Sequence, residues 1–302
     1  MNTSKMVKRV MHDGTLFNGR LDYRVYDSVQ AFADAAATDA TDCPDDSRQS
    51  RNAEADRRWD DRVGFDGAVT MAREGWAEGR KRIARIAEKF REDILGNNRQ
   101  EFQSPQFTRS LVGSGVNVGR FVAGMPDAMI VRKPMPMSMP VINILLNMTC
   151  SSGISGESYM QRGAAVAALV DLLELAGRRV SVTTVLSDGK SSEQHAEFVV
   201  RVKNAGDPLQ VDALAFALAH PAFFRRLGFS VLETMDKASR NRLNVGDGGR
   251  GYGWVTEAKF DRGDLYMPGM AWDERWDDAN AEAWVHARLV DMGVLKKEAA
   301  VA

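Results

Sequence analysis

Oxygen-bearing side chains follow directly after an apolar run in the middle of this chain. The run Val141–Leu146 ends at Asn147, and hydroxyl residues come within the next eight positions. A buried strand of an open α/β sheet delivers such groups to the sheet edge, where these folds place their sites. Amide and hydroxyl oxygens are ligands that suit Mg²⁺ and can also contact a protein. The pattern predicts a partner-binding surface made by Asn147, Thr149, Ser151, Ser152 and Ser155.

The residues after this run alternate between strand and helix patterns. Apolar runs rich in β-branched residues are interrupted by segments with apolar residues at three- and four-residue spacing. This alternation predicts an α/β fold, a three-layer, mostly parallel sheet of the Rossmann type with right-handed crossovers. We expect strands at 141–146, 180–186, 195–202, 229–232 and 264–267, and helices at 158–176, 211–219, 221–227 and 279–292.

Composition shifts divide the chain into four parts. Polar residues dominate the N-terminal part, and helical periodicity is clearest between Gly67 and Leu95. Prolines at every second or third position forbid both a helix and a central strand, so they mark a connector. We expect a poorly structured segment at 1–62, a mainly helical region at 63–133, a Met/Pro connector at 134–140 and an α/β domain at 141–302.

The part from 141 to 302 resembles a von Willebrand factor A (integrin I-like) domain. That fold opens with an apolar strand, a D-x-S-x-S turn and a long amphipathic helix, and here the turn reads N-x-T-x-S. The resemblance implies a Mg²⁺ site in which Asn147, Thr149 and Ser151 are ligands. Asn147 replaces the charged aspartate, which lowers the expected metal affinity and favours a degenerate, metal-independent contact surface. The alternative is that the three side chains only bond the backbone of a tight turn.

Two further stretches resemble a family of phage- and prophage-associated proteins. They are Val118–Gly124 (VGRFVAG) and Arg162–Ala165 (RGAA), which precedes a leucine-rich helix. The resemblance implies a phage context and carries no activity.

A basic helix at 73–91 offers an alternative function. Its cations could lie along a phosphate backbone, although Glu78, Glu88 and Glu92 interleave with them and favour a solvated face. In the nucleic-acid interpretation the contacts are made by Arg80, Lys81, Arg82, Arg85 and Lys89.

A second alternative is a divalent-metal-dependent hydrolase. It would use Asp188, Asp207 and the acidic C-terminal cluster of Asp261, Asp264, Asp273, Glu274, Asp277 and Asp278. The G-x-G-x-x-G match at 246–251 is followed by Tyr252 and Gly253, which do not start a helix, so we expect a surface loop there. The four histidines lack metal-ligand spacing.

Composition narrows the class of protein. The net charge is −1, only Cys43 and Cys150 are present, and no apolar run is long enough to span a bilayer. We therefore expect a soluble cytoplasmic protein without disulfides, without a membrane partner and with no required cofactor. Because no catalytic set is complete, the leading hypothesis is a non-enzymatic protein-interaction or assembly protein.

Overall fold

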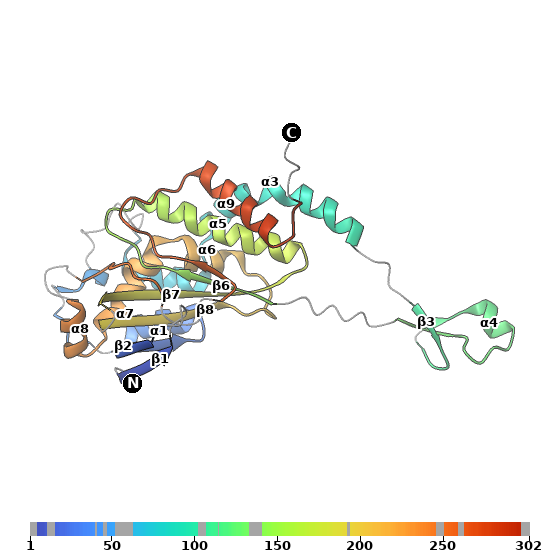
Figure 1. Ribbon diagram of the computed structural model, residues 1–302, viewed down its shortest axis with the longest axis horizontal. Helices are drawn as coiled ribbons and strands as arrows, with labels where there is room; N and C mark the ends of the chain where they lie inside the picture. Colours follow the sequence, from blue (N-terminus) through green and yellow to red (C-terminus); the bar gives the residue numbers. More distant parts are fainter. Residues whose placement is uncertain are drawn as a thin grey trace.

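The computed structural model describes residues 5–10, 16–39, 41–44, 47–51, 63–101, 107–113, 115–132, 141–191, 194–245, 251–258 and 263–296. These residues form an α/β structure with a six-stranded sheet in the order β1-β2-β8-β7-β6-β9 (Figure 1). Three of its five pairings are parallel, so the predicted α/β class with a mostly parallel sheet is confirmed. The strands are β1 (Lys5–Val10), β2 (Leu16–Tyr26), β6 (Val141–Asn147), β7 (Arg179–Ser191), β8 (Gln194–Lys203) and β9 (Leu265–Met267).

Helices form two tiers over one face of this sheet. The inner tier includes α5 (Gly156–Leu175) and α6 (Val211–Ala219), which share one large apolar core with β6, β7 and β8. The outer tier consists of α3 (Ala77–Glu101) and α9 (Asp278–Asp291), which pack on α5. Figure 1 shows α3 and α9 above α5, and the sheet below it. The sheet and the two tiers make the three layers.

Shorter helices complete the body. A predicted strand at 229–232 is helical instead, because an apolar run that is buried all round has no period to separate strand from helix. The remaining helices are α1 (Val29–Thr38), η2 (Gln49–Arg51), α2 (Gly64–Glu74), the π-helix η3 (Phe223–Gly228), α7 (Phe229–Glu233) and α8 (Lys237–Leu243). None of the described helices is both long and apolar enough to cross a membrane.

Gly163 allows α5 and α6 to approach very closely. A Cβ atom built at this position would lie 2.1 Å from the carbonyl oxygen of Leu218. The alanines around it, including Ala164 and Ala167, are fully buried, so small side chains line the crossing. The backbone of α6 occupies the space that any larger residue at 163 would need.

The prediction of a poorly structured segment at 1–62 does not hold for the residues described there. β2 lies inside the sheet, parallel to β8, with Tyr26 opposite Val200. α1 packs on β8 and η3, and its Phe32 is fully buried. β2 pairs with a strand about 170 residues later, and that partner is invisible to local periodicity.

The predicted boundary between a helical region and an α/β domain also needs correction. α2 and α3 pack on α6, and α3 packs on α5, so they belong to the same body as the sheet. The connector at 134–140 lies outside the described residues. Within the predicted helical region, residues 107–132 form a small antiparallel sheet in the order β3-β5-β4.

We call residues 107–132 the 107–132 module. It contains β3 (Phe107–Ser110), β4 (Gly115–Val116), α4 (Val118–Val122) and β5 (Met129–Arg132). Asn117 caps α4 by accepting the N–H of Arg120 at 3.2 Å. Figure 1 shows the module lying away from the body.

Gly163→Ala should destabilise the protein by about 1–3 kcal/mol or more, because the new methyl group overlaps the backbone of α6. Gly96→Ala is the matched control, since Gly96 is also helical and has open space around its Cβ position. That substitution should stabilise by up to about 1 kcal/mol through helix propensity. Urea unfolding of both variants checks this, and equal effects would contradict the close crossing.

Candidate functional site

The end of β6 is sealed inside the protein. Asn147 and Thr149 are both 0% exposed. The amide oxygen of Asn147 accepts the N–H of Thr149 at 3.0 Å, and its amide nitrogen donates to the carbonyl of Thr256 at 2.7 Å. Thr149 Oγ1 accepts the N–H of Ser187 at 3.0 Å and donates to the Ser187 carbonyl at 3.1 Å. Both side chains are inaccessible to a partner, which corrects the predicted contact surface at these two positions.

A buried arginine closes this junction from the helix side. Arg162 on α5 is 0% exposed and donates to the carbonyl of Pro268 at 2.6 Å and to that of Asn147 at 3.1 Å. Its guanidinium lies 5.6 Å from the ring centre of Tyr159. In the sequence, Arg162 stands out only as part of a resemblance. In the structure it braces β6 against the residues after β9.

The three serines of the predicted surface have different surroundings. Ser151 is buried, and its backbone N–H donates to the carbonyl of Met270 at 3.0 Å. Ser152 is exposed. Ser155 is the N-cap of α5 and accepts the N–H of Ser158 at 3.2 Å. The three side chains thus differ in exposure and in hydrogen bonding, and only Ser155 has a capping role.

These contacts do not fit the predicted Mg²⁺ site. Asn147 Oδ1 and Thr149 Oγ1 are both engaged by backbone groups, as expected for side chains that hold a tight turn. In the part of the chain that the structure describes, no three His, Cys, Asp or Glu side chains are grouped to hold a metal ion. Burial also raises the pKa of the Cys150 thiol to about 12, so this neighbour is a poor nucleophile.

The residues of the predicted hydrolase are not brought together. Asp188 lies opposite Ala196 near the start of β8, whereas Asp207 follows its end and bonds Asn204 in a turn. Asp261 and residues 246–250 of the glycine-rich motif lie outside the described residues. The acidic C-terminal side chains have structural roles: Asp264 accepts from Asn143, Glu274 from Trp276, Asp277 caps α9 and Asp278 accepts from Gln161.

Asp188 is nevertheless unusual, because it is a fully buried carboxyl on the sheet. No described residue donates to its Oδ2. Burial raises the pKa of Asp188 well above its ordinary value of 3.8, and the backbone N–H groups of Trp254 and Gly189 oppose that rise. A carboxyl in such surroundings favours the protonated form.

Most cations of the predicted nucleic-acid face are paired within the chain. Arg80 binds Asp212 of α6, and Arg82 binds Glu157 of α5 at 3.0 Å. Two further residues reach α9: Arg85 lies 3.9 Å from Asp278, and Lys89 pairs with Glu282. Lys81 is exposed. The basic residues of α3 thus link it to three neighbouring helices, a role that the local sequence does not reveal.

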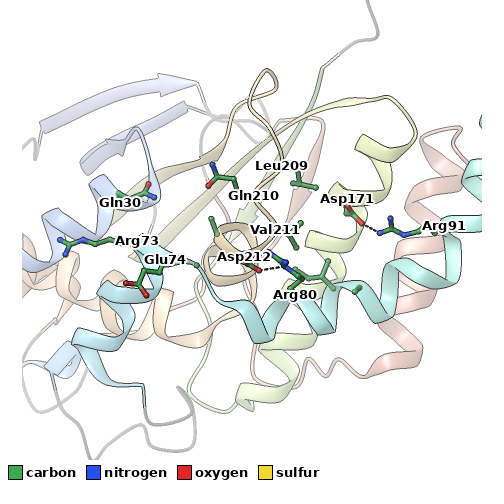
Figure 2. A pocket seen from close by; sticks show the side chains of 14 residues that line it. Gln30, Arg73, Glu74, Arg80, Arg91, Asp171, Leu209, Gln210, Val211 and Asp212 are labelled. Carbon is green, nitrogen blue, oxygen red and sulfur yellow. Dashed lines mark hydrogen bonds and ion pairs between the residues drawn. The ribbon is translucent and has the colours of Figure 1, made fainter.

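A charged pocket lies where α2 meets α3, beside the start of α6. It has a volume of about 620 Å³, within the range of ligand sites. Figure 2 shows Arg80 turned toward Asp212 and Arg91 toward Asp171. The donor–acceptor distances of these two hydrogen bonds are 2.7 and 2.8 Å. Its lining residues are Gln30, Arg73, Glu74, Gly75, Arg80, Ile83, Ala84, Arg91, Asp171, Leu209, Gln210, Val211, Asp212 and Ala213.

The charged side chains of this pocket are mostly paired. Its lining holds three arginines and three carboxylates, and no His, Cys, Ser or Thr belongs to the described lining. Arg80 pairs with Asp212 and Arg91 with Asp171, whereas Arg73 pairs with Asp34. Burial raises the pKa of Asp171, and the adjacent Arg91 opposes that rise. The two ion pairs hold α3 against α5 and α6.

The strongest unpartnered surface is on the 107–132 module. Seven of the eleven large exposed hydrophobic residues in the described structure lie there, although the module is a small part of the chain. Surface patches of this kind mark interaction sites. The seven are Leu111 (71% exposed), Val112 (78%), Val116 (47%), Val118 (70%), Phe121 (67%), Val122 (80%) and Met125 (46%).

A comparison with protein families identifies a relationship across nearly the whole chain. Residues 17–295 match the family described as Domain of unknown function (DUF7192). The chain belongs to this family. No curated protein and no solved structure matches the chain.

The DUF7192 match clarifies the organisation of the molecule. It begins within β2 and ends after α9, so it takes in the 107–132 module and the whole sheet except β1. The sheet, its helices and the module therefore belong to one family unit. The match assigns no activity, and the von Willebrand factor A and phage resemblances stay predictions for this DUF7192 protein.

Arg162→Met should destabilise this DUF7192 protein by about 3 kcal/mol, because the carbonyls of Pro268 and Asn147 lose charge-assisted hydrogen bonds in a buried place. Arg201→Met is the control, since Arg201 pairs with Asp27 at the surface and should change stability by under about 1 kcal/mol. Denaturant unfolding measures both. A loss for Arg162→Met no larger than the control would show that the brace is unimportant.

Asp188→Asn should change how stability depends on pH. The pKa of Asp188 is raised in the folded state, so the folded protein holds this proton more tightly than the unfolded chain does. The stability that the proton contributes is therefore fully present below pH 3.8, the ordinary pKa, and is lost as pH rises toward the folded pKa. Asparagine does not titrate, so the stability of the variant relative to wild type should increase from about pH 4 toward neutral pH. Unfolding at several pH values tests this, and a pH-independent difference would refute it.

Proposed function

We propose that this protein is a non-enzymatic protein-interaction or assembly protein that uses the 107–132 module as its contact surface. The observation that carries the proposal is the concentration of exposed apolar side chains on the module. The module takes the place of the end of β6 as the proposed contact surface, because Asn147 and Thr149 are buried inside the body.

The energetics of the module support this role. Among its described side chains, Ala128 is the one buried hydrophobic residue, at 4% exposure. A small sheet without an apolar face packed on a core gains little stability from its hydrogen bonds alone. Burying Phe121 and Val122 against a partner would gain about 1.5–3 kcal/mol for each side chain. Partner binding would therefore supply the core that the module lacks.

The body supports the proposal in a different way. Most described basic residues of α3 pair with acidic residues of α5, α6 and α9. Few of them are left to contact a phosphate backbone, which weakens the nucleic-acid alternative. The hydrolase alternative has no converging carboxylates among the described residues. Both alternatives stay predictions, as do the cytoplasmic location and the phage context.

Photo-crosslinking from inside the module tests the proposal. A benzophenone amino acid in place of Phe121 should give a discrete intermolecular protein adduct in extracts of the producing cell, because that ring is 67% exposed on the proposed surface. The same amino acid in place of Leu95, which is 43% exposed on α3, is the control and should give none. If position 121 crosslinks only within its own molecule, or if positions 121 and 95 give equal amounts of adduct, the proposal is wrong.

A further inference from the structure

The 107–132 module is positively charged, in contrast to the rest of the chain. It carries three arginines, Arg109, Arg120 and Arg132, and one acidic residue, Asp127, which gives it a net charge of +2. The whole chain has a net charge of −1, so the remaining residues together carry −3. A patch whose charge is opposite to that of its surroundings attracts a partner of the complementary charge and directs it to the patch.

The one acidic residue of the module is already engaged. Arg120 donates to Asp127 at 2.6 Å, and this hydrogen bond lowers the pKa of Asp127. The charge of Arg109 lowers that pKa further, so Arg109 also acts on this carboxylate. Two cations beside one carboxylate leave a positive charge without compensation. Arg109 is exposed and can offer that charge to a partner.

Exposed apolar side chains accompany these cations. Arg109 precedes Leu111 by two residues, and Arg120 is next to Phe121 on α4. Leu111 is 71% exposed and Phe121 is 67% exposed. The apolar face is small, and small interfaces are typical of weak and transient complexes. In such a complex, charges at the rim raise the association rate and select the partner, while the apolar contacts supply affinity.

The number of cations indicates which class of acidic partner fits. Segments that bind anionic lipids use clusters of about four to eight Lys or Arg residues. Proteins that bind DNA neutralise about six to ten phosphates. The module has three arginines, of which Arg120 is paired with Asp127, and it has seven large exposed apolar side chains. This ratio fits an acidic protein segment that brings apolar side chains of its own.

We propose that the partner of the 107–132 module is an acidic segment of another protein, whose apolar side chains cover Phe121 and Val122 while its carboxylates face Arg109. The inference rests on the proposed function and names the chemistry of the partner. A guanidinium and a carboxylate form two parallel hydrogen bonds, which makes their pairing strong and directional. The negative charge of the remaining residues repels an acidic segment elsewhere on the chain and so favours the module.

Salt and charge reversal test the proposal in the photo-crosslinking experiment. The chain with benzophenone at position 121 should give at least about threefold less intermolecular adduct at 500 mM NaCl than at 50 mM, because salt screens exposed charges. Arg109→Glu in that chain should lower the yield about three- to tenfold, whereas Arg109→Lys keeps the charge and should retain most of it. Lys81→Glu is the matched control, since Lys81 is exposed on α3 and the same reversal there should leave the yield unchanged.

Mass spectrometry of the adduct identifies the segment that position 121 reaches. A segment of another protein with a net negative charge over roughly ten residues around the crosslink supports the proposal. A neutral or basic segment, a second copy of this chain, an adduct with nucleic acid or lipid, or a yield that neither salt nor Arg109→Glu changes would each overturn it. The salt response is measured without a charge substitution, so it does not depend on how Arg109→Glu folds.

The two proposals fail in different ways. If a discrete protein adduct forms, its yield is independent of salt and the segment reached is not acidic, the interaction function stands and the acidic partner is wrong. If position 121 gives no intermolecular adduct at either salt concentration, both are wrong.

Discussion

The body of this protein depends on the buried guanidinium of Arg162. A charged group that leaves water loses much of its hydration energy, and only close hydrogen-bonding partners offset that loss. Here the partners are two backbone carbonyls, one at the end of β6 and one just after β9. The need for these two hydrogen bonds fixes the position of α5 over the sheet. It also draws the residues after β9 over the strand end, where Met270 continues the pairing beside Cys150.

The sealed strand end explains why a common rule of α/β folds does not locate the site here. In open sheets of this class the carboxyl ends of parallel strands usually line a crevice. In this protein backbone groups of Thr256, Pro268 and Met270 fill that place. The Thr256 carbonyl accepts from the Asn147 side chain, the Met270 N–H donates to the Thr149 carbonyl, and the Pro268 carbonyl accepts from Arg162. The polar side chains at this sheet edge therefore make buried hydrogen bonds that hold the strand end in place. The exposed apolar surface lies instead on the 107–132 module.

Local sequence patterns predicted much of the fold, but they did not predict which side chains are exposed and which are buried. The strand expected at Val141–Leu146 is β6, and the alternation of strands and helices after it led to the correct class. The burial of Asn147 depends on residues more than a hundred positions away, which no local pattern contains. For the same reason the acidic partners of Arg80 and Lys89 on α6 and α9 were invisible, so α3 resembled a phosphate-binding face. The apolar side chains of α4 were visible in the sequence, but their exposure follows from the lack of a packing partner among the described residues.

The position of β2 has a consequence for how the chain reaches this structure. β2 ends at Tyr26, and the strand it pairs with, β8, begins at Gln194. Contacts that join such distant residues must close a long loop before they contribute stability, and they slow folding. During synthesis β2 can pair only with β1 until β8 has emerged, although β6, β7 and α5 can assemble before β8. We therefore expect the sheet to grow outward from its centre, with β2 among the last strands to join it.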